Sequence, residues 1–592
     1  MKNTILSLFI VLYVLFIGSC TKKRVTKKPN IVFIMTDDMG YETLSCNGAV
    51  NYDTPNLDRL ASESYIFTNC DSQPLCCPTR IKLVTGQYNY RNYKGWGSFD
   101  LEYPAIGKVI QRAGYATAVF GKWHMNKSPE ELGFDEHCIF TGSPDELPYA
   151  EFFKRYYYNC PVIEDGKDTV VAYAPDKFNR RALQFIEKNR DNPFFLYYPL
   201  SLSHNPFEPI PDSENPDSRN WQDNFEDMVA YSDKMIGRVI KKLKEEDLYE
   251  NTIIFYTSDN GTKTLAHEMS GGEVIYGGKG TQRVDGVHVP LFVKYDGTHK
   301  ILDDLVDFSD FYPTIASIGG ITKQELSNRM DGVSFHPLLK GEQREPKPYI
   351  FSVFFHPLNA YIRGKEFKYY LDGRLYNINR DPRELHPFYS RSDSPETARK
   401  REKLKTWLAE LLEGSQFSEY STKDQLLKTF EDYRSDKDNH WLLSSFIFDS
   451  LEYVPRSETL LLNLTDFLDK NLELYSLRFS REHRSRNSGL TYADAVINSV
   501  GIFQGGDTLL TKNFEEMELT TRHNVDMLRT RGNPIISFTR EGDDSKVSLG
   551  KLALNKSETV RLEVDVALSN PANQWGDRIM LYVYLDKEEK EE

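Results

Sequence analysis

The chain has 592 residues, of which 40% are hydrophobic and 27% are charged. This composition is typical of a globular protein, and the length favours roughly two to four domains. The formal net charge of −14 argues against bulk attraction to nucleic acid. An anionic substrate would therefore need a local cluster of positive charge.

Residues 1–20 have the features of an export signal. Lys2 is followed by an apolar run, residues 5–17, which is too short to span a bilayer comfortably. The run ends in IGSC, which resembles a bacterial lipoprotein lipobox and implies cleavage before Cys20 and lipidation of its thiol. A plain secretory signal peptide is the alternative. We expect an exported protein held to the bacterial cell envelope by a lipid anchor alone, with residues 21–29 as a tether.

Between Asn30 and about Asp310, short apolar runs are each followed at once by polar residues. The runs are IVFIM before Thr36-Asp37-Asp38, ATAVF before Gly121-Lys122-Trp123-His124, FFLYYPL before Ser203-His204-Asn205, and TIIFYT before Ser258-Asp259-Asn260-Gly261. Runs that are apolar on both faces, separated by helix-like stretches such as residues 226–246, indicate an α/β fold. We expect a mostly parallel sheet covered by helices.

The polar residues at these strand ends predict a shared site. Loops that leave the carboxyl ends of parallel strands lie on one edge of the sheet, where ligands bind. Asp37 and Asp38 at one end, with Asp259 and Asn260 at another, offer hard oxygen ligands that suit Ca²⁺ or Mg²⁺ and disfavour zinc. Each residue alone could serve a turn or a helix cap. Two acid-rich ends at one edge favour metal binding.

The segment PLCCPTRIKLVTG places Cys76 beside Cys77 and follows them with Pro78, which fits the first turn of a helix. A helix N-terminus offers unpaired amides and a partial positive charge to an anion, and Arg80 adds a fixed positive fork. A buried structural pair of cysteines is the alternative. The other cysteines of an exported protein could form disulfides, but the spacing assigns no pairing.

The remaining chain indicates further units. Residues 305–320 are expected to form a helix that closes a main domain of residues 30–345. Residues 346–414 predict a smaller α+β subdomain with a terminal helix. Residues 415–592 predict an accessory domain that is partly helical to about Arg484 and then β-rich, because apolar residues alternate from Val560 to Leu568 and again within residues 579–585.

The segment CCPTRIKLVTG resembles the sulfatase signature, Cys-x-Pro-Ser/Thr-Arg followed by four residues and Thr-Gly. Further blocks agree in order along the chain: TDDMGY, DTPNLDRLA, GYATAVFGKWHM, SHNPFEP, TSDNG, GGKGTQRVDGVHVP and LYNINRDPREL. The resemblance spans about Pro29 to Gly414. It implies an alkaline-phosphatase-like fold and a type I formylglycine-dependent sulfatase with a calcium site, Ca²⁺ being favoured over Mg²⁺.

In this family the first cysteine of the signature, here Cys76, is oxidised after translation to formylglycine, which implies a maturation enzyme as a partner. The hydrated aldehyde attacks sulfur, and its second hydroxyl then expels sulfate by C–O cleavage. A serine would lack this exit. By motif position, the resemblance assigns metal binding to Asp37, Asp38, Asp259, Asn260 and the hydrated Cys76 side chain.

The same resemblance assigns the charged residues around the nucleophile. Arg80 and Lys122 would hold the hydrate and its charge, and His124 would be the base that triggers elimination. His204 and Lys279 would bind the sulfate together with Lys122 and protonate the leaving oxygen. One block departs from the family: where Glu-Gly-Gly-x-Arg-Val-Pro is usual, residues 284–290 read VDGVHVP, so that loop is not expected to keep its usual contacts.

We therefore expect hydrolysis of sulfate esters on a sulfated saccharide, by analogy with exported enzymes that carry extra domains. His356 and Arg363 are candidate substrate contacts. The aromatic residues of 148–159 either stack on sugars or pack as a core. A phosphonate or phosphodiester hydrolase of the same superfamily is one alternative. A non-catalytic glycan-binding lipoprotein with unmodified Cys76 is another.

Overall fold

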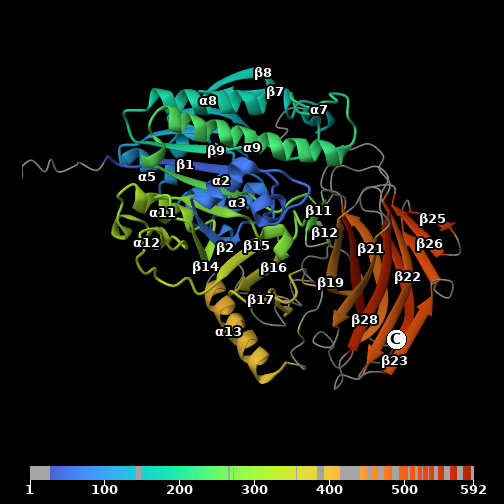
Figure 1. The fold of residues 1–592 in the computed structure, drawn as a ribbon. Coiled ribbons are helices and arrows are strands. Elements are labelled where there is room, and N and C mark those ends of the chain that lie inside the picture. Colours follow the sequence, from blue (N-terminus) through green and yellow to red (C-terminus); the bar gives the residue numbers. More distant parts are fainter. Residues whose placement is uncertain are drawn as a thin grey trace, which may run out of the picture.

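The computed structural model describes residues 27–413 apart from 142–148, 264–266, 271–272, 355, 372, 383, 385–387 and 389–392. Beyond residue 413 it describes the strands β19 to β29, between His440 and Lys587, by their backbone (Figure 1). The predicted signal and lipidation site, residues 1–20, lie outside the described residues, as does most of the predicted tether.

The four apolar runs form the centre of one large sheet. β1 (Asn30–Thr36) pairs in parallel with β10 (Thr252–Ser258) on one side and with β9 (Phe194–Pro199) on the other. β5 (Ala116–Lys122) continues the parallel arrangement beside β9. The sequence prediction of these strands is confirmed. Every residue of β1, β9 and β10 is buried, as expected for strands covered on both faces.

The whole sheet is mixed, in the order β14-β2-β13-β10-β1-β9-β5-β6-β7-β8. The outer strands are β2 (Tyr65–Asp71), β6 (Glu136–Phe140), β7 (Tyr158–Glu164), β8 (Lys167–Tyr173), β13 (Leu291–Lys294) and β14 (Lys300–Asp307). β13, β7 and β8 pair with their neighbours in an antiparallel manner, whereas β6 and β14 are parallel to β5 and β2. The parallel centre therefore carries antiparallel strands towards both edges.

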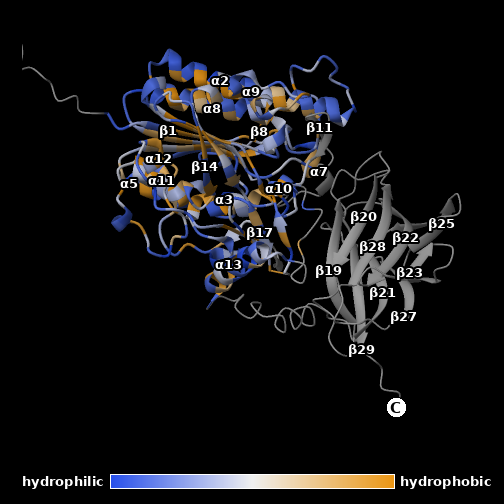
Figure 2. Ribbon diagram, turned by 60° about the horizontal axis from the view of Figure 1, so that its bottom comes forward, coloured by the Kyte–Doolittle hydropathy of each residue, from blue (hydrophilic) through white to orange (hydrophobic). Residues whose placement is uncertain are grey.

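Helices cover both faces of this sheet and share its hydrophobic core (Figures 1 and 2). Val32 and Ile34 face the cluster that contains α2 (Pro55–Ser62), α8 (Ala174–Lys188) and α9 (Trp221–Glu245). The alternate residues Ile31, Phe33 and Met35 face the cluster that contains α3 (Cys76–Thr85), α5 (Ile106–Arg112), α11 (Phe311–Ile318) and α12 (His336–Leu339). The helix predicted over 226–246 is α9.

Short elements connect these layers. They are η1 (Tyr41–Thr43), η2 (Ser45–Asn47), α4 (Asn89–Asn92), β3 (Tyr93–Gly95), β4 (Ser98–Phe99), α6 (Pro129–Leu132), α7 (Tyr149–Lys154), η3 (Tyr249–Asn251), β11 (His267–Ser270), β12 (Glu273–Tyr276), α10 (Val284–Val287) and η4 (Lys323–Glu325).

The predicted helix over 305–320 was too long. Its first residues belong to β14, because Leu305 and Val306 pair with β2 before the chain turns into α11.

The subdomain predicted after residue 346 is an antiparallel sheet with one helix. β15 (Ile350–Phe354), β16 (His356–Arg363), β17 (Phe367–Tyr370) and β18 (Leu375–Asn377) pair in sequence order. α13 (Pro395–Leu412) contributes Leu404, Leu408 and Leu412 to their hydrophobic cluster. The expected α+β character is confirmed.

Buried ion pairs join this subdomain to the main sheet. Arg363 donates from Nε and Nη2 to the two carboxylate oxygens of Asp71 at 2.7 and 2.5 Å, and both side chains are at most 4% exposed. Lys82 of α3 lies 3.3 Å from Asp307 and donates to the carbonyl of Phe351 on β15 at 3.2 Å. Lys347, just before β15, also pairs with Asp307, at 2.7 Å.

The strands after residue 440 form two sheets, drawn in orange to red in Figure 1. One has the order β19-β29-β21-β27-β24, and the other β20-β28-β22-β26-β25 with β23 paired to β22. The strands are β19 (His440–Asp449), β20 (Arg456–Asn463), β21 (Leu472–Glu482), β22 (Ala493–Gln504), β23 (Asp507–Asn513), β24 (Glu518–Arg522), β25 (Val525–Thr530), β26 (Asn533–Phe538), β27 (Asp544–Leu552), β28 (Val560–Ser569) and β29 (Arg578–Lys587).

The two strands predicted from alternation near the C-terminus correspond to β28 and β29. The partly helical character expected before Arg484 is wrong for the described part, since residues 440–482 contain β19, β20 and β21. Leu, Glu and Arg in these segments are good helix formers, but strand preference depends on pairing partners far along the chain. Residues 414–439 lie outside the described residues.

Among the helices of the described residues, none combines the length and apolarity needed to cross a membrane.

The Asp71–Arg363 pair generates a stability prediction. Arg363→Met should lower the free energy of unfolding by about 3–5 kcal/mol, because it leaves the Asp71 carboxylate buried without its partner. Urea denaturation would measure this. The matched control is Lys323→Met, which breaks the exposed Lys323–Glu345 pair (84% and 66% exposed) and should change stability by less than about 0.5 kcal/mol. Equal losses would contradict the prediction.

The same pair predicts a pH dependence. Burial alone raises the pKa of Asp71, but the Arg363 guanidinium outweighs it and lowers the pKa to about 2, against about 3.9 in an unfolded chain. The stabilisation is therefore complete above about pH 4 and is lost as the pH falls through 2. The stability gap between wild type and Arg363→Met should narrow over that range.

Candidate functional site

Two acid-rich strand ends lie side by side at the carboxyl edge of the sheet. Thr36 of β1 is in register with Ser258 of β10, so Asp37-Asp38 and Asp259-Asn260 leave the sheet together. The Asp38 amide donates to Asp259 Oδ1 at 3.3 Å, and all four side chains are fully buried. The edge predicted from the sequence therefore gathers three carboxylates and one amide in one place.

Each carboxylate of this acidic cluster, Asp37, Asp38 and Asp259, has a cation beside it. Lys122 Nζ at the end of β5 lies 2.5 Å from Asp37 Oδ2. Arg80 Nη2 lies 2.6 Å from Asp259 Oδ2. Lys279 Nζ lies 2.6 Å from Asp38 Oδ2. Three buried carboxyl groups are thus matched by three cations, which lowers the free-energy cost of burying them.

The helix α3 brings Cys76 to this cluster. Cys76 is its first residue and is 2% exposed, and every residue of the helix is buried. Thr79 fixes its orientation, because its hydroxyl donates to the carbonyl of Asp259 at 2.7 Å and accepts from the Gln73 amide at 3.0 Å. A donor atom from each of Asp37, Cys76 and Asp259 lies within 4.8 Å of the others. The side chain at position 76 is therefore within reach of a group held by the aspartates.

The cluster fits a hard divalent cation. Asp37 Oδ1 and Asn260 Oδ1 are buried and accept no hydrogen bond from any residue that the structure describes. Such orphaned oxygens are costly, and Ca²⁺ or Mg²⁺ would satisfy them. Burial and the neighbouring carboxylates raise the pKa of Asp37 to about 8 despite Lys122. A bound dication would oppose that shift.

His124 lies directly beside Cys76, with Nδ1 3.0 Å from Sγ. Burial lowers the pKa of His124 well below its usual value, and the nearby Lys122 and Arg80 lower it further. Its ring is therefore neutral at pH 7. Asp38 and His124 both adopt left-handed backbone conformations, with φ of 60° and 59°, which is uncommon for residues other than glycine and concentrates at functional sites.

Comparison with known proteins bears on this arrangement. Residues 29–321 match the sequence model of the family described as Sulfatase. The matched residues carry the whole acidic cluster and the helix α3. Two sulfatases similar to the chain are N-acetylgalactosamine-6-sulfatase of Mus musculus (28% identity over 357 residues; 54% of this chain, 67% of that protein) and N-acetylglucosamine-6-O-sulfatase of Bacteroides thetaiotaomicron (25% over 529 residues; 69% and 91%).

The solved structure of Ps i-CgsB in complex with k-i-k-neocarrahexaose shares the fold, with a TM-score of 0.54 and 26% identity. It covers 69% of this chain and 98% of that chain. The expected α/β architecture of the sulfatase is therefore confirmed. Because its relatives are named sulfatases, the chain is a sulfuric ester hydrolase.

His204 of the sulfatase follows β9 and faces the same cluster. One of its ring nitrogens lies within 4.8 Å of carboxylate oxygens of Asp37 and Asp38. Nδ1 is in close contact with the carbonyl of Asn205, which can only accept a hydrogen bond, so Nδ1 carries the proton. Burial and then Lys122 lower the pKa of His204 well below its usual value. The neutral ring therefore leaves its Nε2 lone pair for the site.

The aromatic stretch of residues 148–159 packs as core where the structure describes it. Phe152, Tyr156 and Tyr157 are at most 3% exposed and belong to the cluster beneath α8 and α9. Tyr156 has a second contact: its ring is stacked on His204, with centroids 5.0 Å apart and planes 7° from parallel. Of the two alternatives for this stretch, packing holds for these residues. Sequence patterning gave no sign that Tyr156 would support a site histidine.

Arg363 and His356 are the two predicted substrate contacts of the subdomain, and the structure describes the side chain of Arg363 only. Arg363 is fully engaged inside the protein, because it donates to Asp71, to Asn69 and to the carbonyl of Gly364. It joins two parts of the fold. The sequence could not distinguish this role from substrate binding, because both need a cation. The His356 side chain lies outside the described side chains.

The unusual loop of residues 284–290 contains α10 and makes its own contacts. His288 lies 3.1 Å from the carbonyl of Thr68 through Nε2 and stacks on Tyr41 at 4.4 Å. Asp285 pairs with Arg283 at 2.8 Å. Lys279, just before this loop, keeps its place against Asp38. The departure from the family pattern therefore does not disturb the predicted lysine.

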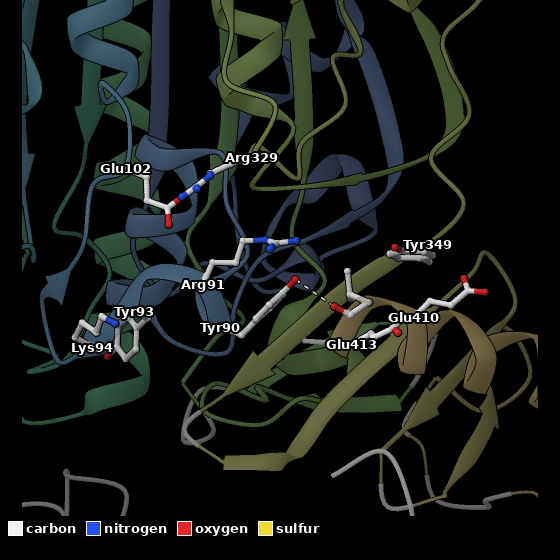
Figure 3. A pocket seen from close by; sticks show the side chains of 10 residues that line it. Tyr90, Arg91, Tyr93, Lys94, Glu102, Arg329, Tyr349, Glu410 and Glu413 are labelled. Carbon is white, nitrogen blue, oxygen red and sulfur yellow. Dashed lines mark hydrogen bonds and ion pairs between the residues drawn. The ribbon is translucent and has the colours of Figure 1, made fainter. Parts of the chain in front are cut away.

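A groove lies elsewhere, where α4 and β3 meet the end of α13 (Figure 3). Tyr90 donates to the carbonyl of Leu411 across it at 3.3 Å. Its exposed cations are paired with acids, as in Arg329 with Glu102 at 3.1 Å. None of the residues that line it belongs to the acidic cluster, so the groove is separate from the chemistry.

The orphaned oxygens predict that the fold is stabilised by a divalent cation. When protein stripped of metal by a chelator is given Ca²⁺ at 100 times its Kd, the free energy of unfolding should increase by about 2.7 kcal/mol. The increase would be measured as a rise in Tm. Asn260→Ala removes one of the buried oxygens that lack a hydrogen bond from the described residues and should weaken Ca²⁺ binding at least tenfold by calorimetric titration. The exposed Asn215→Ala is the control. A Tm that ignores both chelator and Ca²⁺ would contradict the site.

Proposed function

We propose that this sulfatase hydrolyses sulfate esters on sulfated carbohydrates, with formylglycine made from Cys76 as its nucleophile and Ca²⁺ as its metal. The observation that carries the proposal is the position of Cys76, at the start of α3 within 4.8 Å of Asp37 and Asp259 and 3.0 Å from His124. The sugar class is supported by the relatives, which are named for sulfated amino sugars, and by a neighbour solved with a neocarrahexaose.

Asp37, Asp38, Asp259 and Asn260 would hold the metal, because their oxygens are buried together and two of them accept no hydrogen bond from the described residues. When bound, a Ca²⁺ ion supplies positive charge that favours ionisation of the nucleophile and polarises the sulfate. The oxygen ligands suit either Ca²⁺ or Mg²⁺, and the preference for Ca²⁺ rests on the family resemblance.

His124 is placed to move the proton of the side chain at position 76. Nδ1 faces that side chain, and the ring is neutral, so Nδ1 has a lone pair for a hydroxyl proton when its tautomer places hydrogen on Nε2. Formylglycine supplies a hydrate whose second hydroxyl can release sulfate once that proton is removed. The imidazolium formed would be short-lived, because burial and Lys122 disfavour it.

Lys122, Lys279 and His204 are placed to bind the sulfate. Although burial opposes it, Asp37 raises the pKa of Lys122 and Asp38 raises that of Lys279, so both remain charged at pH 7. His204 is neutral without substrate and would donate from Nε2 only after taking up a proton. A bound sulfate supplies the negative charge that raises the pKa of His204, so the substrate itself would create the acid that protonates the leaving oxygen.

The nucleophile prediction concerns Cys76. Peptide mass spectrometry of the protein from its native host should show SH₂ replaced by oxygen at residue 76. Cys76→Ala should reduce kcat/KM on 4-nitrophenyl sulfate to background, and His124→Ala should reduce it by about 10²–10⁴-fold. The exposed Cys46→Ser is the control and should retain activity.

Two results would overturn this assignment. An intact thiol at Cys76 in the protein from its native host would exclude the nucleophile and favour a non-catalytic glycan-binding lipoprotein. A large preference for 4-nitrophenyl phosphate would favour a phosphorus ester hydrolase of the same superfamily. A panel of 6-O-sulfated N-acetylglucosamine, 6-O-sulfated N-acetylgalactosamine and sulfated galactan oligosaccharides would identify the sugar by release of sulfate.

We further infer that the protein is exported and lipid-anchored through Cys20, on the strength of the IGSC motif after an apolar run. Fractionation of native-host cells that express either of two variants tests this. Cys20→Ser should move the protein from the membrane fraction to the soluble fraction, whereas Cys46→Ser should leave it with the membrane. Retention of Cys20→Ser in the membrane fraction would refute the anchor.

A further inference from the structure

The short hairpin of β3 and β4 places an exposed indole beside the site histidine. Its turn consists of Trp96 and Gly97, and the Trp96 ring lies edge-on to His124 with centroids 4.9 Å apart. Trp96 is 42% exposed, whereas Trp123, the first residue after β5, is 1% exposed. Trp96 therefore presents a large apolar ring to solvent directly beside a buried histidine of the site.

This turn is held from two sides by the segments that carry the reacting groups. The Gly97 amide donates to Cys77 Sγ at 3.0 Å, and the Gly97 carbonyl accepts from the Asn126 amide at 2.9 Å. Gly97 has a φ of +74°, and a Cβ there would meet Asn126 Oδ1 at 2.1 Å. The hairpin therefore has one position relative to Cys76 and His124, and the indole is fixed with it.

The hairpin also accounts for the second cysteine of the signature segment. Cys77 is buried, and its pKa is raised to about 12 by burial, so its thiol is neutral and inert. Its role is to accept the hydrogen bond from Gly97. Cys77 is thus a positioning residue that couples the helix carrying Cys76 to the turn carrying Trp96.

We propose that Trp96 is a platform on which the sugar ring of the substrate stacks while its sulfate enters the acidic cluster. This rests on the proposed function and adds the subsite that recognises the carbohydrate. A pyranose ring presents an apolar C–H face that packs on an aromatic ring, and tryptophan offers the largest such face. The sulfate would approach Lys122 and Lys279, and the indole lies beside His124 of the same site, so the ring that carries the sulfate would meet it.

The competing explanation is that Trp96 merely covers His124. In that case its removal would disturb the reacting groups directly, and every sulfate-bearing ligand would be affected to the same degree. A platform for the sugar predicts instead that the loss depends on the presence of a sugar ring. Inorganic sulfate, which occupies the charged site without a ring, separates the two explanations.

The experiment measures Kd by calorimetry in full-length Cys76→Ala protein with Ca²⁺ present. The probes are inorganic sulfate, 6-O-sulfated N-acetylglucosamine and a 6-O-sulfated heparan tetrasaccharide. Adding Trp96→Ala should raise the ratio of Kd for either saccharide to Kd for sulfate about tenfold, and Trp96→Phe should restore most of the loss. Ile301→Ala, which removes an apolar side chain 63% exposed on β14, is the matched control and should not change the ratio.

Positioning by Cys77 has its own readout in the same assay. Cys77→Ser keeps an acceptor for Gly97 and should preserve the ratio, whereas Cys77→Ala should raise it, by less than Trp96→Ala does. In the active enzyme, Trp96→Ala should raise KM on the sulfated saccharide more than it lowers kcat.

The platform is overturned if Trp96→Ala weakens sulfate and saccharides by the same factor, if it weakens none of them, or if the Cys76→Ala protein binds no saccharide. Failure of the proposed function looks different. The wild type would then release no sulfate from any saccharide, while Trp96-dependent sugar binding could still be measured.

Discussion

The site depends on the pairing of buried carboxylates with buried cations at the carboxyl edge of the sheet. Asp37, Asp38 and Asp259 are fully buried, and each has Lys122, Lys279 or Arg80 within 2.6 Å. Without these partners the acids would take up protons or leave the interior. With them, each acidic group faces one cation, so each incoming charge changes the cluster markedly.

This pairing explains how one site can attract both a divalent cation and a sulfate. The orphaned oxygens of Asp37 and Asn260 favour the cation, and once it is bound the net charge turns positive. That surplus favours an anion, which in turn raises the pKa of the neutral His204. The electrostatics therefore favour binding of the cation before binding of the sulfate. In this way a chain with a formal net charge of −14 can still concentrate an anionic ester at one site.

Much of this was predictable because it rests on local patterns. The four strand-end motifs lie on strands with strong apolar runs, and the parallel centre of the sheet follows from those runs. The antiparallel strands and β14 were missed or misread, since Leu305 and Val306 fit a helix or a strand equally well until their pairing with β2 is known. The pairing of Arg363 with Asp71 was not predictable, because the sequence does not reveal which acid a given cation meets. Trp96 went unnoticed because β3 and β4 are too short to show any period, and its importance comes from a contact with a residue 28 positions away, the difference between 96 and 124.

The ammonium of Lys82 has a consequence for how this enzyme can be divided. α3 carries Cys76 at its start, and within the same turn and a half Lys82 reaches Asp307 and the backbone of β15. A fragment cut before residue 346 would leave this charge without the Phe351 carbonyl and would remove Lys347 from Asp307. The smallest portable form of the catalyst therefore includes the subdomain through α13. A truncation after residue 413 would leave these contacts of the nucleophile helix intact, whereas one before residue 346 would break them.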